Sequence, residues 1–168
     1  MDSIHHSYNQ LLASLPSADF GAIRPHLRSL ELTHQSTLVR AGEPLMQVYF
    51  PHSGIISLIM RLAEGETVEV AMVSRDSVFG ASAAFNGGIA LKEAVVQLSG
   101  TASVLDVAEL RKAAEQSLPF RTMLIRHEQA LFAQALQSAA CNASHSVESR
   151  LSVGCRARVT SPATTCCR

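Results

Sequence analysis

Residues 55–73 read IISLIMRLAEGETVEVAMV, and this stretch decides the fold class. Two runs rich in apolar and β-branched residues, Ile55–Met60 and Thr67–Val73, flank a short polar loop, Ala63–Glu66. Runs of this length and composition are typical of β-strands. Gly65 supplies the positive φ that a tight connection requires. The stretch therefore predicts an antiparallel β-hairpin.

The sequence around the hairpin extends the same pattern in both directions. Between Leu30 and Asp106, short runs of Val, Ile, Leu, Tyr and Phe are interrupted by glycines, mostly about a dozen residues apart. Such regular interruption is typical of an all-β sandwich or barrel. The central part of the chain is therefore predicted to be a β-roll or jelly roll.

Helices are predicted on both sides of the β-region. Residues 1–29 form a helical lead whose short helix begins with a capping Ser or Asp near Asp19. Val107–Gln116, rich in Ala, Leu, Glu and Lys, predicts a short helix. Pro119 suits the first turn of a longer helix that reaches about Leu151. The predicted fold class is mainly β with helices (α+β). The chain is divided into a helical lead (1–29), the β-roll (30–106), the short and long helices (107–152) and a tail (153–168).

The length and composition indicate one packed domain. Of 168 residues, 47% are hydrophobic and 17% are charged, which is enough apolar material for a single core. Fourteen Lys and Arg balance fourteen Asp and Glu, so the chain lacks the positive charge of a free-standing nucleic-acid binder. No apolar run approaches the roughly 18–20 residues of a membrane span. Met1–Gln10 lacks a secretory signal, so we expect a soluble, cytoplasmic protein without membrane contact.

The long helix carries an apolar stripe that is too broad for one face on one core. At 1.5 Å per residue this helix is about 45–50 Å long, longer than a small domain requires. Alanines spaced four apart permit close approach of a second helix. We therefore expect a homodimer through this helix; the alternative is that the helix packs entirely on its own β-roll. The residues assigned to the dimer seam are Leu124, Leu131, Phe132, Ala135, Ala139 and Ala143.

Four stretches carry a resemblance to a known family. They read LVRAGEP at 38–44, VYFPHSGIIS at 48–57, EVAMVSRDSVFG at 69–80 and AACNASHSVESRL at 139–151. In order and spacing they resemble the ligand-sensing half of Crp/Fnr-type bacterial transcription regulators, over about residues 10–152. The resemblance implies a cyclic-nucleotide-binding-like β-roll, or jelly roll, followed by a dimerisation helix. This agrees with the fold class predicted from the residues themselves.

The resemblance also implies a phosphate-binding cassette at residues 80–96. In the matching register, Ala81 replaces the carboxylate that accepts from a ribose hydroxyl, and Lys92-Glu93 replaces the Arg-Ser pair that clamps the phosphate. Lys lacks the bidentate fork of Arg, and Glu93 repels an anion. The cassette is therefore predicted to be degenerate. The residues assigned to it are Gly80, Ala81, Ser82, Lys92, Glu93 and Ala94.

Two functions remain open on this sequence. The first is the sensor and dimerisation half of a transcription regulator with a pocket filled by its own side chains. The side chains expected to fill it are Phe79, Phe85 and Val95. The second is a stand-alone module without a DNA role that binds a cyclic nucleotide, the one cofactor candidate, or another small ligand. Its available cations are Arg40, Arg75 and Lys92.

Catalytic and metal chemistry receive no support. The histidines lack the spacing of a cupin-like metal site, and there is no nucleophile elbow or phosphate loop. No cysteine precedes Cys141, so the N-terminal iron–sulfur cluster known in the family has no ligands here. Cys141 itself is expected to be an inert thiol in the alanine-rich face. We expect no enzyme activity and no bound metal.

The tail, residues 153–168, abandons the helical pattern after Ser152. Read from the last base of each preceding codon, it can encode RWLPRARDLAGDDLLP, which resembles the approach of these regulators to their winged helix-turn-helix. We hypothesise a one-base frameshift after Ser152 that leaves a disordered tail; the alternative is a natural short tail. DNA and RNA polymerase are then partners of an intact, full-length form alone.

Overall fold

The computed structural model describes residues 9–61, 65–85 and 87–144. The chain divides into two compact units, Met1–Gln129 and Ala130–Arg168. The first unit contains the described strands and the start of helix α4 (Leu118–Ser144), which continues into the second. Among the described helices, none is both long and apolar enough to cross a membrane.

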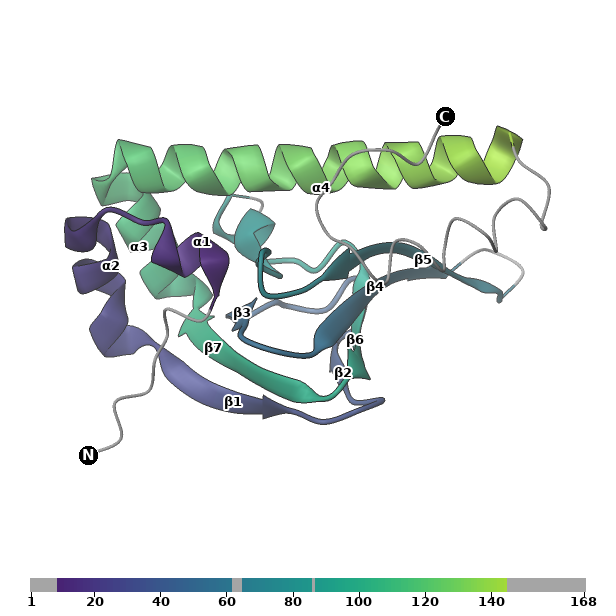
Figure 1. Ribbon diagram of the computed structural model, residues 1–168, viewed down its shortest axis with the longest axis horizontal. Coiled ribbons are helices and arrows are strands. Elements are labelled where there is room, and N and C mark those ends of the chain that lie inside the picture. Colours follow the sequence, from purple (N-terminus) through teal and green to yellow (C-terminus); the bar gives the residue numbers. More distant parts are fainter. Residues whose placement is uncertain (1–8, 62–64, 86, 145–168) are drawn as a thin grey trace. The chain divides into compact units, whose positions relative to one another are not determined.

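The described strands form two antiparallel sheets (Figure 1). In spatial order, one sheet is β1-β7-β3 and the other is β2-β6-β4-β5. The strands are β1 Arg28–Leu32, β2 Thr37–Val39, β3 Gln47–Pro51, β4 Ile55–Arg61, β5 Thr67–Val73, β6 Glu93–Leu98 and β7 Gly100–Asp106. The chain crosses from one sheet to the other at Ser99, between β6 and β7. Two sheets joined in this way make the predicted jelly roll, and the fold class is confirmed.

The predicted hairpin is confirmed as β4 and β5. The two strands pair from Ile56 opposite Val73 to Arg61 opposite Thr67. Gly65, in the connection, has the expected positive φ of +88°. Ile56 and Val73 are both completely buried, so the hairpin contributes directly to the core of the roll.

The predicted helices after the roll are also present. Helix α3 is Val107–Gln116, with the bounds that the sequence predicted. Helix α4 begins at Leu118, where the Ser117 hydroxyl accepts a hydrogen bond from the Phe120 N–H at 3.2 Å. This contact satisfies one of the free N–H groups of the first turn. The predicted end of the helix near Leu151 lies outside the described residues.

The lead differs from the prediction in two respects. Helix α2 (Ser17–Ile23) is present, but the predicted side-chain cap is wrong, because Pro16 occupies the N-cap position and no side chain caps the helix. A 3-10 turn, η2 (Arg24–His26), follows it directly. A further short helix, α1 (Gln10–Ala13), precedes α2 and was not predicted, since one turn is too short to show helical periodicity.

Asn9 fixes α1 to the roll. Its side chain is completely buried, and its Oδ1 accepts from the N–H groups of Leu11 and Leu12 at 3.0 and 3.1 Å. Its Nδ2 donates to the carbonyls of Pro51 at 3.0 Å and Ser77 at 2.9 Å. One amide therefore caps the helix and joins it to two separate parts of the β-roll.

We expect Asn9→Ala to lower the free energy of unfolding by about 2–3 kcal/mol, because it removes a cap and the hydrogen bonds to one buried and one partly buried carbonyl. Urea unfolding monitored by circular dichroism measures the change. The matched control is Ser14→Ala, whose exposed hydroxyl donates to the Leu11 carbonyl at the other end of the same helix. Equal stability of the two variants would contradict the assigned role of Asn9.

Candidate functional site

The cassette begins at a turn that requires glycine. Gly80 has a φ of +94°, and a Cβ at this position would lie 3.0 Å from Leu45 Cδ2 and 3.2 Å from the Gln47 carbonyl oxygen. The positive φ would strain a larger residue, and the Leu45 side chain and the Gln47 carbonyl would have to shift to admit its Cβ. The turn leads into the 3-10 helix η3 (Ala81–Ala84), whose Ala81 is completely buried.

The cassette continues through a glycine pair that crosses an adjacent loop. Gly87 and Gly88 both have a φ of +80°. The Gly88 carbonyl accepts from the Leu45 N–H at 2.6 Å, and the Ala90 N–H donates to the Glu43 carbonyl at 3.0 Å. These backbone bonds fix the path of the chain into β6, where the predicted clamp residues lie.

The clamp residues do not form a free pair of ligands. Glu93, the first residue of β6, lies 3.6 Å from the guanidinium of Arg61 on β4, the neighbouring strand. Lys92 is partly buried, and its charge acts on the carboxylate of Glu128, a residue of α4. Ala94 is completely buried and offers no polar side chain. Each of the two charged clamp residues therefore already interacts with an oppositely charged side chain of this chain.

Side chains of α4 bond to the backbone at the start of the cassette. Glu128 Oε1 accepts from the Ser82 N–H at 3.2 Å. The preceding residue, His127, accepts through Nε2 from the Val78 N–H, also at 3.2 Å. All four residues belong to the first unit. No role is predicted for His127 or Glu128 from the sequence alone.

A side chain of α3 bonds to the other end of η3. The guanidinium of Arg111 donates through Nε to the Ala84 carbonyl at 3.1 Å and through a terminal nitrogen to the Ala83 carbonyl at 3.4 Å. A short 3-10 helix leaves its terminal N–H and C=O groups without partners inside the helix. Here α3 and α4 supply partners at both ends, so η3 is held by the helices that follow the roll.

His127 is neutral at ordinary pH. Its side chain is 8% exposed, and burial lowers its pKa to about 4, an effect that Asp76 partly opposes by its negative charge. Because Nε2 accepts from Val78, the proton of the neutral ring is assigned to Nδ1. Nδ1 has no hydrogen-bond partner among the described residues. Protonation of Nε2 would place a buried charge here and break the bond to Val78.

Glu128 is a partly buried carboxyl. Burial raises its pKa above the usual range, while the bond from Ser82 and the charge of Lys92 act in the opposite direction. Desolvation of the carboxylate is therefore the larger effect.

The side chains predicted to fill the pocket differ in exposure. Phe79 is buried and its ring centroid lies 5.9 Å from that of Tyr49, and Val95 is partly buried. The prediction is wrong for Phe85, which is 44% exposed. This residue follows the end of η3 and turns outward, where the guanidinium carbon of Arg121 lies 6.0 Å from its ring centroid.

The residues predicted for the dimer seam differ in exposure. Leu124 is completely buried within the first unit, so its assignment to the seam is corrected to a core residue of this chain. Phe132 is 64% exposed and Ala139 is also exposed, whereas Ala135 is partly exposed and Leu131 is 8% exposed. Ala143 lies in α4, but its side chain is outside the described residues.

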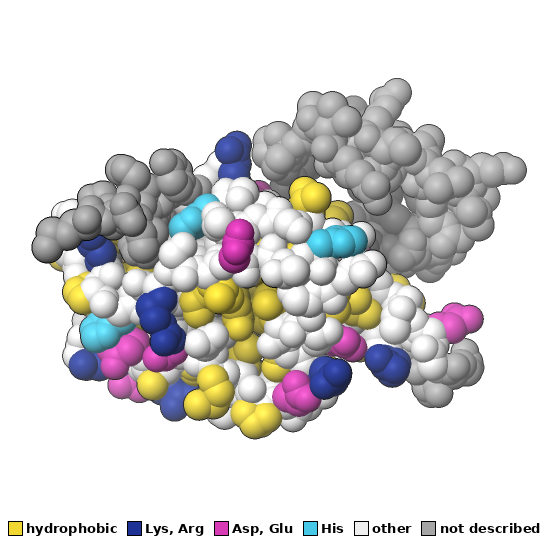
Figure 2. Space-filling model, turned by 90° about the horizontal axis from the view of Figure 1, so that it is seen from below, with side chains coloured by type: hydrophobic (Ala, Val, Ile, Leu, Met, Phe, Trp, Pro, Cys, Tyr) yellow, Lys and Arg dark blue, Asp and Glu magenta, His cyan; other side chains and the backbone are white. Residues whose placement is uncertain are grey.

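Charges on the described surface are mixed. Arg40 lies 3.7 Å from Glu43, and Arg75 is exposed, so neither joins Lys92 at the cassette in a described contact. Lys and Arg side chains alternate with Asp and Glu on the face shown in Figure 2. Within the described ranges, no group of three or more His, Cys, Asp or Glu side chains is placed to hold a metal ion.

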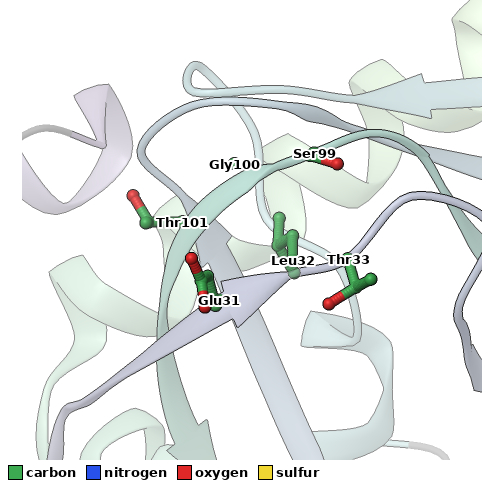
Figure 3. Close-up of a pocket in the computed structure, with 6 residues that line it drawn as sticks. All are labelled: Glu31, Leu32, Thr33, Ser99, Gly100 and Thr101. Carbon is green, nitrogen blue, oxygen red and sulfur yellow. The ribbon is translucent and has the colours of Figure 1, made fainter.

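A separate open hollow lies where β1 meets β7 (Figure 3). It is lined by Glu31, Leu32, Thr33, Ser99, Gly100 and Thr101. Glu31 is the ionisable residue of this lining, so the hollow offers no cation to an anionic ligand. None of the predicted cassette residues contributes to it.

We expect the stability of the protein to fall below about pH 6.5 because of His127. Its pKa is about 4 in the folded state and about 6.5 when unfolded, so the stability contribution is complete above pH 6.5 and is lost as pH falls toward 4. Relative to His127→Gln, which is neutral and retains an acceptor for Val78, the wild type should lose about 3 kcal/mol over this range. Urea unfolding at several pH values measures both; parallel curves would contradict the prediction.

Comparison with known proteins places this geometry in a family. Residues 30–117, more than half of the chain, match the cyclic nucleotide-binding domain. No curated protein sequence matches the chain. The matched range contains both the cassette and Arg111, whereas His127 and Glu128 lie beyond it.

Solved structures share the fold at low sequence identity. The N-terminal domain of a transcriptional regulator from Streptomyces coelicolor A3(2) is 19% identical, with a TM-score of 0.57 over 83% of this chain and 94% of that one. The c-di-GMP responsive global regulator CLP of Xanthomonas campestris is 12% identical, with a TM-score of 0.73 over 88% and 74%. FixK2 of Bradyrhizobium japonicum is 17% identical, with a TM-score of 0.59 over 66% and 55%.

The resemblance seen in the sequence is therefore confirmed. The jelly roll and the long helix that follows it agree with the matched domain and with the solved structures that share this fold. The chain belongs to the cyclic nucleotide-binding domain family, and its structural neighbours include Crp/Fnr-type transcription regulators.

Proposed function

We propose that this chain is the signal-input and dimerisation part of a Crp/Fnr-type transcription regulator, with a cassette that does not hold a cyclic nucleotide by the usual clamp. One observation carries the proposal: the Ser82 N–H of the cassette is already bonded to the carboxylate of Glu128 on α4. The cassette is therefore joined to the helix that continues into the second unit. In such a regulator, a signal at the roll shifts the population of α4 positions, and hence the spacing of two DNA-reading domains.

The charges at the cassette support the absence of a usual clamp. Glu93 occupies a clamp position and pairs with Arg61, so it cannot bind a phosphate. Lys92 supplies a single cation without the bidentate geometry of Arg. Each charge-assisted hydrogen bond that is missing costs a ligand about 1.5–3 kcal/mol. A cyclic nucleotide would lose several such bonds here.

The exposed residues of α4 support the dimer. Ile125, Phe132 and Leu136 are 40%, 64% and 55% exposed. Their spacing of seven and four residues places them on one face of a helix, as in a helix–helix seam. Large apolar side chains in one exposed row mark an interaction surface. We propose that a second copy of this chain covers the row.

We expect the double substitution Phe132→Glu with Leu136→Glu to convert the dimer into a monomer, because two carboxylates would be buried in the seam of each copy. Sedimentation velocity distinguishes the 18.0 kDa chain from twice that mass. Gln134→Glu, also on the exposed surface of α4, is the control and should leave the dimer intact. A monomeric wild type at micromolar concentration would overturn the dimer.

We further propose that this regulator binds DNA only in a form that carries a winged helix-turn-helix. The shifted reading of residues 153–168 is compatible with a one-base frameshift after Ser152, which would separate this module from a winged helix-turn-helix. DNA and RNA polymerase are then contacted by the full-length form. Resequencing the coding DNA from codon 145 through a few hundred bases after codon 168 tests this. An open frame with a helix-turn-helix after a one-base change is expected, and a closed frame would overturn it.

The second candidate function is a stand-alone module for a cyclic nucleotide. The matched family and the partly buried Lys92 favour it. Calorimetric titration with cyclic AMP and cyclic GMP separates the candidates. A degenerate cassette predicts no binding heat for the wild type, whereas binding in the micromolar range would favour the stand-alone module.

A further inference from the structure

Two consecutive residues of α4 accept hydrogen bonds from backbone N–H groups at the start of the cassette. His127 Nε2 accepts from the Val78 N–H and Glu128 Oε1 accepts from the Ser82 N–H, each at 3.2 Å. The two N–H groups lie on either side of the Gly80 turn. Adjacent residues of α4 thus bond to the backbone on both sides of Gly80, so α4 fixes the whole glycine turn.

The charges around Glu128 are balanced without a ligand. Lys92 is the described positive charge that acts on its carboxylate. Glu93, next in sequence, is paired with Arg61 at 3.6 Å. Asp76 acts on the neighbouring His127, which is neutral. An anion at the Ser82 N–H would meet Lys92, whose charge already acts on a carboxylate, while the Arg111 guanidinium is bonded to carbonyls at the other end of η3.

An anionic ligand and the Glu128 carboxylate compete for one position. A backbone N–H donates one strong hydrogen bond, and the Ser82 N–H donates its bond to Glu128. A phosphate at the same N–H would lie within a few ångströms of that carboxylate. Like charges repel strongly where the surroundings are partly desolvated, as the raised pKa of Glu128 indicates they are here.

We propose that Glu128 determines the specificity of the cassette, because its carboxylate occupies the Ser82 N–H and excludes phosphate-bearing ligands. This inference rests on the proposed function and names the ligand class that the same site rejects. A neutral ligand is not repelled by the Glu128 carboxylate. An anion that does bind must first displace Glu128, and it thereby acts directly on α4.

Removal of the carboxylate should open the cassette to anions. The probes are cyclic AMP, which carries one phosphate charge, and adenosine, which shares its base and ribose but carries none. In calorimetric titrations the wild type should give no binding heat with cyclic AMP. Glu128→Ala should bind cyclic AMP at least about tenfold more tightly than the limit that this wild-type result sets, while the result with adenosine should not change. Glu128→Gln keeps an oxygen for Ser82 but removes the charge, so its gain should be smaller and should also be confined to cyclic AMP.

The control is Glu115→Gln, which removes one negative charge from an exposed position of α3 and should bind both probes as the wild type does. Thermal unfolding verifies that each variant is folded. Unchanged cyclic AMP binding in both Glu128 variants would overturn the inference, as would an equal gain for adenosine, since that would show a gain of space rather than a loss of repulsion.

Failure of the inference is distinct from failure of the proposed function. Micromolar binding of cyclic AMP by the wild type would contradict the degenerate cassette, whether or not the Glu128 variants bind more tightly. An absence of binding in the wild type and in both variants would contradict the role of Glu128 and leave the proposed regulator module standing.

Discussion

The buried backbone groups of the cassette need hydrogen-bond partners, and the rest of the site depends on how this chain supplies them. An unpaired buried N–H or C=O costs about as much as a lost hydrogen bond, so η3 cannot remain in place with open ends. Arg111 on α3 bonds to its last carbonyls, and Glu128 on α4 bonds to the Ser82 N–H. The helices that follow the roll therefore complete a structure that the roll leaves incomplete.

This arrangement joins the pocket region to α4 by short contacts. Phe120 and Leu124 are completely buried, which fixes the first turns of the helix in the core of the first unit. The same turns then present His127 and Glu128 to Val78 and Ser82. A ligand or modification that changes the cassette backbone must break or re-form these bonds. In the proposed regulator, a signal at the cassette would therefore reach α4 through these two hydrogen bonds, with no intermediate element.

Much of the fold could be predicted from the sequence because it rests on local patterns. The runs rich in apolar and β-branched residues within Ile55–Arg61 and Thr67–Val73, with the glycine at position 65, specify a hairpin without any distant contact. The composition of Val107–Gln116 specifies α3 in the same way. Helix α1 could not be predicted, because it depends on bonds from Asn9 to carbonyls 42 and 68 residues away in the chain.

The site was harder to predict than the fold for the same reason. Ser82 of the family cassette was located by its order in the sequence, but its partner lies 46 residues further along the chain, and the partner of Val78, just before the cassette, lies 49 residues further. One signal was available in the sequence: His127 lies three residues after Leu124 and four before Leu131, on the stripe of α4 that the structure shows to be buried. A polar residue at a buried helical position needs a partner, and Glu128 follows it directly.

Amide hydrogen exchange at Val78 and Ser82 is the most direct test of whether α4 closes the cassette. Both N–H groups donate to side-chain acceptors, so their protection from exchange reports the bonds to His127 and Glu128 rather than strand pairing. We expect both amides to exchange slowly in the wild type and Ser82 to exchange much faster in Glu128→Ala, with the strand amides of β4 unchanged. Rapid exchange of Ser82 in the wild type, or the same slow exchange in the variant, would contradict the closed cassette.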